Sequence, residues 1–99
     1  MIGIDLVTID RFESSDRLPK FLSHFRVDGT TALAAAKTWA CMEAIIKAED
    51  QEFDINKIRI RFPKGSRPEV EDPDRVLGGK YSLSVSHEGS TVIAIALRA

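Results

Sequence analysis

The segment WACMEAIIKA, residues 39–48, is the part of the chain around which the remainder is organised. Alanine-rich sequence has a high helix propensity, so we expect one long helix that is capped by Thr30 or Thr31 and extends to about Glu49. The helix carries apolar side chains on nearly every face, which predicts that it is well buried in the fold. The remaining segments read as β-structure that packs against it.

Two oppositely charged residues, Glu43 and Lys47, stand one turn apart on the same face of this helix. The simplest interpretation is an exposed ion pair worth about 0.3–0.5 kcal/mol. A second carboxylate, Asp5, lies in the strand-like run 2–9, on the face opposite to the isoleucine and leucine side chains. An ionised carboxylate is costly to bury without a partner. Asp5 therefore lies either on the solvent-exposed face of an edge strand or in a site that binds a hard cation.

The composition narrows the class of protein. Ninety-nine residues suggest one domain, 1–99, whose core is modest, and oligomerisation is a common remedy for a small core. The net charge of −1 gives no reason to expect a nucleic-acid partner. No apolar run approaches the length of a membrane span and no signal-peptide pattern is present. We expect a cytoplasmic protein that has no membrane partner.

Alternating apolar residues predict several strands in the second half of the chain. Residues 57–62 read as a half-buried strand, 69–71 as a brief return strand, and 81–87 with 91–97 as a hairpin. With the strand at 2–9, they predict an α+β fold, a small antiparallel sheet packed on one long helix.

The segment 10–25 predicts a short helix that starts at Ser14, Ser15 or Asp16 and has Pro19 in its first turn. Its basic character usually marks a solvated face, but it also suits an acidic protein partner. The basic residues in and beside it are Arg11, Arg17, Lys20 and Arg26.

Four short motifs follow one another along the chain. They are G-I-D at 3–5, W-A-x-x-E-A-x-x-K-A at 39–48, G-x-x-P at 65–68 and S-V-S-H-E at 84–88. In this order they resemble the 4′-phosphopantetheinyl transferases, specifically the small holo-acyl-carrier-protein synthase type. The likeness covers nearly the whole chain and implies the fold of that family.

The resemblance implies transfer of the 4′-phosphopantetheine group of coenzyme A to a serine of an acyl carrier protein, with sites between the protomers of a homotrimer. It implies that Asp5 and Glu43 hold Mg²⁺, which prefers oxygen ligands and stabilises charge on transferring phosphates. Lys47 then acts on a phosphate oxygen as a point charge. Either a metal-bound water or Glu43 accepts the serine proton, and this choice stays open.

The same resemblance assigns further residues to substrates. Lys37, Lys47, Ser86 and His87 are candidates for binding coenzyme A. For His87 the alternative is a histidine at the end of a hairpin that bonds to the backbone. Arg11, six residues after Asp5, matches a basic position used against the carrier protein, and we assign Arg17 to the same contact.

Three places depart from the pattern of the family. Met42 stands where the family has Lys before the Glu, and Thr38 where it has Arg before the aromatic residue. The acidic run 49–52 replaces a glycine-rich loop, although amides and cations suit the phosphates of a coenzyme. A second hypothesis is therefore a non-catalytic transferase-like module that binds a carrier protein or a partner subunit. A third is an α+β domain whose motif matches are accidental.

Overall fold

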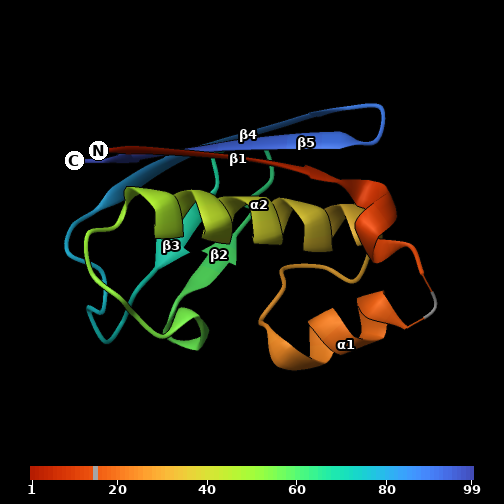
Figure 1. Cartoon of the computed structure of the whole chain (residues 1–99), viewed down its shortest axis with the longest axis horizontal. Coiled ribbons are helices and arrows are strands. Elements are labelled where there is room, and N and C mark those ends of the chain that lie inside the picture. The colour runs from red at the N-terminus through yellow and green to blue at the C-terminus, as the bar shows by residue number, and fades with distance from the viewer. Residues whose placement is uncertain (15) are drawn as a thin grey trace.

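A computed structural model describes residues 1–14 and 16–99. A three-stranded antiparallel sheet in the order β1–β5–β4 packs on one long helix, α2, and a two-stranded sheet, β2–β3, lies beside it (Figure 1). This arrangement confirms the predicted α+β class. The elements in chain order are β1 (Ile2–Thr8), the 3₁₀ helix η1 (Ile9–Phe12), α1 (Arg17–His24), α2 (Ala32–Ala48), the 3₁₀ helix η2 (Ile55–Lys57), β2 (Arg59–Arg61), β3 (Glu69–Glu71), β4 (Tyr81–Glu88) and β5 (Thr91–Arg98).

Helix α2 begins and ends close to the predicted residues. The Thr31 hydroxyl accepts a 3.1 Å hydrogen bond from the backbone N–H of Ala34, which satisfies one of the free donors of the first turn. The helix ends at Ala48, and Glu49 is already extended. The predicted burial is confirmed, although Lys47 and its neighbour Ile46 remain exposed. No helix within residues 1–14 and 16–99 is both long and apolar enough to cross a bilayer.

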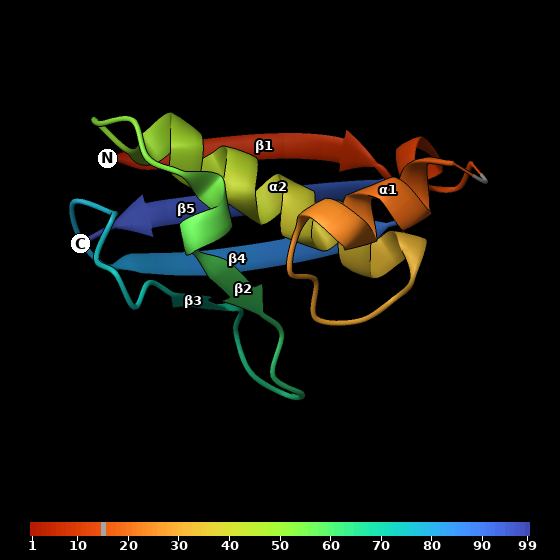
Figure 2. The same cartoon turned by 90° about the horizontal axis from the view of Figure 1, so that it is seen from below.

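Small residues let α2 approach the sheet closely. Gly3 of β1 lies so near the helix that a Cβ atom at this position would overlap the carbonyl oxygen of Ala44. Ala94 and Ala96 of β5, which face the same side as Gly3, are fully buried. Figure 2 shows α2 running along the sheet over this layer. The packing of alanine and glycine therefore determines how deeply α2 sits on β1 and β5.

The other face of the sheet is apolar and exposed. Its rows pair Ile2 with Leu97, Ile4 with Ile95, and Leu6 with Ile93 across β1 and β5, and the serines of β4 continue the same rows. These six apolar side chains are between 40% and 63% exposed. We call them the outer face. A contiguous apolar patch of this kind is typical of a protein–protein interface.

The segment 10–25 forms two elements in place of the single expected helix. Residues 9–12 form η1, and α1 follows with Asp16 at its N-cap and Pro19 in its first turn, as expected. Of the other two expected starts, Ser14 accepts a 3.2 Å hydrogen bond from the N–H of Arg17 through its hydroxyl, and Ser15 lies outside the described residues. Aromatic contacts join these elements to α2: the ring centroids of Phe12 and Phe21 are 4.9 Å apart, and those of Phe21 and Trp39 are 6.0 Å apart.

The strand expected at 57–62 is shorter than predicted. Asp54 caps η2 by accepting a 3.0 Å hydrogen bond from the N–H of Asn56, so Lys57 belongs to that turn and β2 starts at Arg59. Strand β3 has the predicted bounds, and the hairpin of β4 and β5 is confirmed with one more residue in each strand.

Candidate active site

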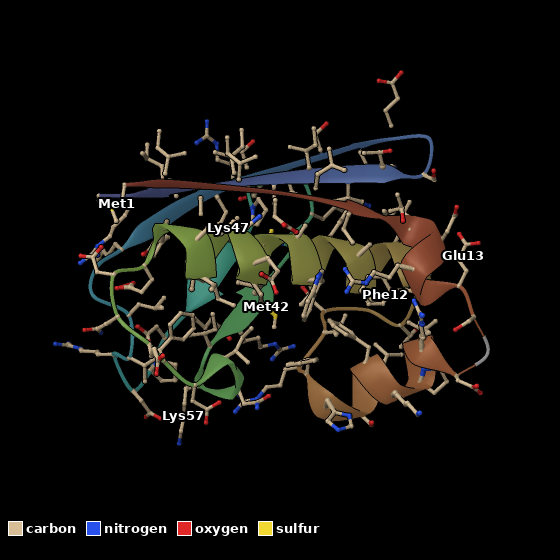
Figure 3. The ribbon with its side chains drawn as sticks, viewed as in Figure 1. Met1, Phe12, Glu13, Met42, Lys47 and Lys57 are labelled. Atoms are coloured by element: carbon tan, nitrogen blue, oxygen red, sulfur yellow. The ribbon has the colours of Figure 1, made fainter. Side chains whose placement is uncertain are left out.

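Strand β1 brings Asp5 to the helix. Its alternation turns Gly3, Asp5 and Val7 towards α2, and Lys47 of α2 contacts Asp5 there. Figure 3 labels Lys47 on the side of α2 that faces the sheet. The Lys47 ammonium donates to Asp5 Oδ1 at 2.9 Å and to the backbone carbonyl of Ile4 at 3.1 Å. The predicted exposed pair of Glu43 with Lys47 is therefore wrong. In the described part of the chain, Lys47 forms its ion pair with the strand, because the strand carboxylate lies within reach of its long side chain.

Glu43 lies one turn before Lys47 on α2 and is half-buried. Residues four apart share a helix face, so Glu43 faces the same strip between α2 and β1 as the Asp5–Lys47 pair. Residues 1–14 and 16–99 contain no cluster of three or more histidine, cysteine or acidic side chains that could hold a metal ion. Mg²⁺ commonly takes only one or two protein carboxylates and completes its shell with water and substrate phosphates. Asp5 and Glu43 supply the kind of oxygen donor that such an ion prefers.

A basic groove lies at the opposite edge of the sheet. It is lined by Lys37 from α2, by the turn 62–68 after β2, and by Ser84 and Val85 of β4. The Lys37 ammonium lies 6.0 Å from the centre of the Phe62 ring. The turn adds two cations that the sequence analysis did not single out: Lys64 directly precedes the G-x-x-P motif, and Arg67 lies within it. Figure 2 shows this turn projecting beyond β4, away from β1.

Lys37 and Lys47 are consequently not brought together. They are ten residues apart, which corresponds to about 15 Å along a helix, and they project from different faces. Lys37 belongs to the basic groove, whereas Lys47 belongs to the strip beside β1. The candidate catalytic and coenzyme-binding residues on α2 of one chain thus fall into two groups, one towards each edge of the three-stranded sheet.

Ser86 and His87 point to opposite sides of β4. Ser86 pairs with Ile93 and faces the outer side of the sheet, whereas His87 pairs with Val92 and faces the helix side. Both side chains are exposed. Within the described residues neither side chain has a hydrogen-bond partner, so the alternative of a backbone-bonded His87 is not supported.

Arg11 and Arg17 do lie together. They line a shallow hollow together with Lys20 and His24, and phenylalanine rings form its floor. The Arg11 guanidinium also lies over the Trp39 ring, 5.4 Å from its centre, which holds it in place. Basic side chains around apolar rings suit an acidic, amphipathic partner.

Two departures from the family pattern are part of the core. Thr38 is fully buried, and its hydroxyl donates a 2.9 Å hydrogen bond to the carbonyl of Ala34. Met42 is also buried, next to apolar residues of α1 and η2. Both side chains are therefore part of the packing around α2, and neither supplies the positive charge that the family pattern has at its position.

The acidic residues after α2 have a structural role that the sequence did not reveal. The Glu49 carboxylate, with 1% of its side chain exposed, accepts hydrogen bonds from the N–H of Gly78 at 3.0 Å and from the Tyr81 hydroxyl at 2.7 Å. Arg98 pairs with Glu49 at 3.5 Å and with Asp50 at 3.1 Å. Burial, together with the hydrogen bond to Glu49, raises the pKa of Tyr81 to about 12. These charges are therefore engaged in holding the loop before β4.

No protein-family model matches the chain. It is similar to the holo-[acyl-carrier-protein] synthase of Mycoplasma mobile, with 31% identity over 105 residues that cover 99% of this chain and 88% of the relative. The synthase of the same name from Mycoplasmopsis pulmonis is 36% identical over 101 residues, 95% of this chain and 85% of the relative. The crystal structure of Helicobacter pylori holo-[acyl-carrier-protein] synthase in complex with coenzyme A has the same fold, with a TM-score of 0.82 over 100% of both chains at 24% identity. The chain therefore belongs to the holo-[acyl-carrier-protein] synthases, a type of 4′-phosphopantetheinyl transferase.

Proposed function

We propose that this protein transfers the 4′-phosphopantetheine group of coenzyme A to a serine of an acyl carrier protein in a Mg²⁺-dependent reaction. The observation that carries the proposal is the contact between Asp5 and Lys47, because it joins the strand motif and the helix motif at one place. The curated relatives are named for synthesis of the holo carrier protein, and the Helicobacter pylori enzyme was solved with coenzyme A.

Asp5 and Glu43 would hold the magnesium ion, which supplies charge neutralisation at the pyrophosphate when it is bound. Lys47 lies beside them and offers its ammonium to a phosphate oxygen. Such a transfer needs positioning and charge stabilisation more than covalent help. The Glu43 carboxylate faces the same strip and is available as an acceptor for the serine proton.

The basic groove supplies the complementary charge for coenzyme A. Lys37 lines it with Lys64 and Arg67, and these cations suit the phosphates of the coenzyme. Ser86 and His87 lie further along β4, on the same edge strand as the groove. Coenzyme A therefore uses Lys37, Ser86 and His87 at the β4 edge and Lys47 at the β1 edge.

One chain holds these two groups of residues at opposite edges of its sheet, which supports sites that are completed between protomers. The outer face provides the apolar surface for such an assembly. The assembly is a homotrimer, with the whole chain acting as one domain of each protomer. We also place the protein in the cytoplasm. Cys41, the single cysteine of the chain, is a free and buried thiol, and the reducing cytoplasm keeps thiols in this state.

The hollow around Arg11 and Arg17 receives the acyl carrier protein. Its cations attract an acidic partner over a distance, while the rings beneath them offer apolar contact. The hollow is formed mainly by residues of η1 and α1. Figure 1 shows both elements beside the N-terminal half of α2.

A mass-shift assay tests the proposal. Apo carrier protein, coenzyme A and Mg²⁺ are incubated with the protein, and the mass added to the carrier is measured. Asp5→Asn and Glu43→Gln should each reduce the rate by roughly a hundredfold or more while leaving the fold intact. Glu13→Gln, an exposed acid outside the strip, is the matched control and should retain the wild-type rate.

Full activity of both variants would show that the metal-site assignment is wrong. If the wild-type protein adds no mass and calorimetry detects no binding of coenzyme A at millimolar concentration, the protein is instead the non-catalytic module. Binding of coenzyme A at micromolar concentration would argue against the hypothesis of a non-catalytic module.

A further inference from the structure

The positively charged ammonium of Lys47 contacts Asp5, the carboxylate that the proposed function assigns to the metal ion. Its ammonium is anchored twice on β1, by Asp5 Oδ1 at 2.9 Å and by the Ile4 carbonyl at 3.1 Å. The Asp5 side chain is only 14% exposed, whereas that of Lys47 is 52% exposed. The carboxylate is thus largely covered by protein, and the lysine occupies part of what remains open.

We infer that Lys47 stands in for the divalent cation at Asp5, and that its ammonium leaves the carboxylate before Asp5 ligates a metal ion. This inference rests on the proposed function. An ammonium and a divalent cation on one carboxylate repel each other strongly at contact distance. Exchange is feasible because an ion pair with an exposed lysine is weak and the four-carbon stem of lysine is flexible.

The exchange links the metal to coenzyme A. A phosphate near the strip gives the displaced ammonium a new partner, so coenzyme A lowers the cost of freeing Asp5. By linkage, each ligand then raises the affinity for the other by the same factor. A divalent cation alone binds weakly, and Lys47 carries part of the coupling.

The test measures metal binding directly, without turnover. Mn²⁺ is titrated into the full-length protein in the absence and presence of coenzyme A, and free Mn²⁺ is followed by its electron paramagnetic resonance signal. Without coenzyme A, Lys47→Met should bind Mn²⁺ roughly two- to fivefold more tightly than wild type, the factor that corresponds to loss of one exposed ion pair. The tightening produced by coenzyme A should be smaller in this variant than in wild type.

Two controls separate a competing contact from a general charge effect. Lys47→Arg keeps a cation at the position and should bind Mn²⁺ as wild type does. Lys57→Met removes one positive charge from the exposed pair with Asp74, away from the strip, and should leave the Mn²⁺ affinity unchanged. Circular dichroism confirms that each variant is folded.

An unchanged or weaker Mn²⁺ affinity of Lys47→Met overturns the inference, and so does an equal gain in Lys57→Met. Retention of wild-type Mn²⁺ binding by Asp5→Asn overturns it as well, because the ion then binds elsewhere. The mass-shift assay separates this failure from failure of the proposed function. If wild type modifies the carrier protein while Lys47→Met gains no affinity, only the exchange is wrong; if wild type neither binds metal nor modifies the carrier, both are wrong.

Discussion

The carboxylate of Glu49 accepts a 2.7 Å hydrogen bond from the hydroxyl of Tyr81, and this contact joins the end of α2 to the start of β4. The same carboxylate accepts a hydrogen bond from the N–H of Gly78 and forms an ion pair with Arg98. An acidic residue directly after a helix opposes the helix dipole, which the last carbonyls make negative. The three partners of the Glu49 carboxylate, Tyr81, Gly78 and Arg98, explain why the chain tolerates it there.

Glu49→Gln should therefore lower the free energy of unfolding by about 1.5–3 kcal/mol, the range for hydrogen bonds to a charged group. Urea denaturation at neutral pH measures the change. Asp50→Asn is the matched control, because this carboxylate has 62% of its side chain exposed and should cost less than about 1 kcal/mol. An equal loss of unfolding free energy in Glu49→Gln and Asp50→Asn would mean that the buried contacts of Glu49 do not stabilise the fold.

Gly3→Ala should destabilise the fold by about 3 kcal/mol, because the added methyl group meets the main-chain carbonyl of Ala44, which cannot rotate away. Thermal unfolding followed by circular dichroism measures the loss. Gly65 provides the comparison: it has φ of 76° but no neighbour near its Cβ direction, so Gly65→Ala should cost only about 1 kcal/mol. A Gly3→Ala protein as stable as wild type would show that β1 does not pack this closely on α2.

Reversing the charges of the hollow around Arg11 and Arg17, the proposed carrier-protein site, should weaken recognition of the carrier protein without altering the transfer chemistry. Arg11→Glu and Arg17→Glu should each raise KM for the carrier protein roughly tenfold, with little change in KM for coenzyme A. The wild-type KM should also rise with salt. Lys57→Glu changes charge equally at an exposed site away from the hollow and serves as the control. A similar KM increase in the control would assign the effect to net charge.

Introducing a charge into the outer face should break the assembly. Ile95 lies in the central row of the outer face, between Ile4 and Ser84, so Ile95→Lys should convert the proposed homotrimer to monomers and reduce transfer activity. Size-exclusion chromatography with light scattering reports the mass. Ile46→Lys is the control, since this residue has similar exposure but lies on α2. A wild-type protein that is already monomeric would contradict the proposed trimer.

Alkaline pH should destabilise the protein through a buried thiol, Cys41, and a half-buried phenol, Tyr81. Burial raises the pKa of Cys41 from 9.0 to about 12, and burial with the Glu49 hydrogen bond raises that of Tyr81 from 10.0 to about 12. The folded chain holds both protons more tightly than the unfolded chain. The contribution of these two groups to the free energy of unfolding is therefore complete below pH 9 and is lost as the pH rises towards 12.

Urea denaturation between pH 8 and pH 11 checks this expectation. Cys41→Ala should be somewhat less stable than wild type at pH 8, because it loses a buried sulfur atom, but its stability should fall less steeply with pH. Parallel curves for the two proteins would exclude the thiol as a source of the alkaline instability.

Local sequence was enough to predict several parts of the fold. The helix 32–48 follows from its alanine content and from Thr31 at the N-cap, and the hairpin of β4 and β5 follows from alternating apolar residues. Period-two geometry also placed Asp5 on the face of β1 opposite to its isoleucines. These features depend on interactions between residues that are near in sequence, so composition and spacing are sufficient.

Contacts between distant residues could not be predicted in this way. Lys47 can reach Glu43 within its helix or Asp5 on β1, and only the position of β1 against α2 decides for Asp5. The role of Glu49 likewise depends on Gly78, which is 29 residues away. The apolar side of β1 faces outward because the glycine and alanine side leaves room for the helix. The sequence alone determined the elements and the candidate residues; the packing of α2 on the sheet decided which charges meet, because that packing brings together side chains that no local pattern relates.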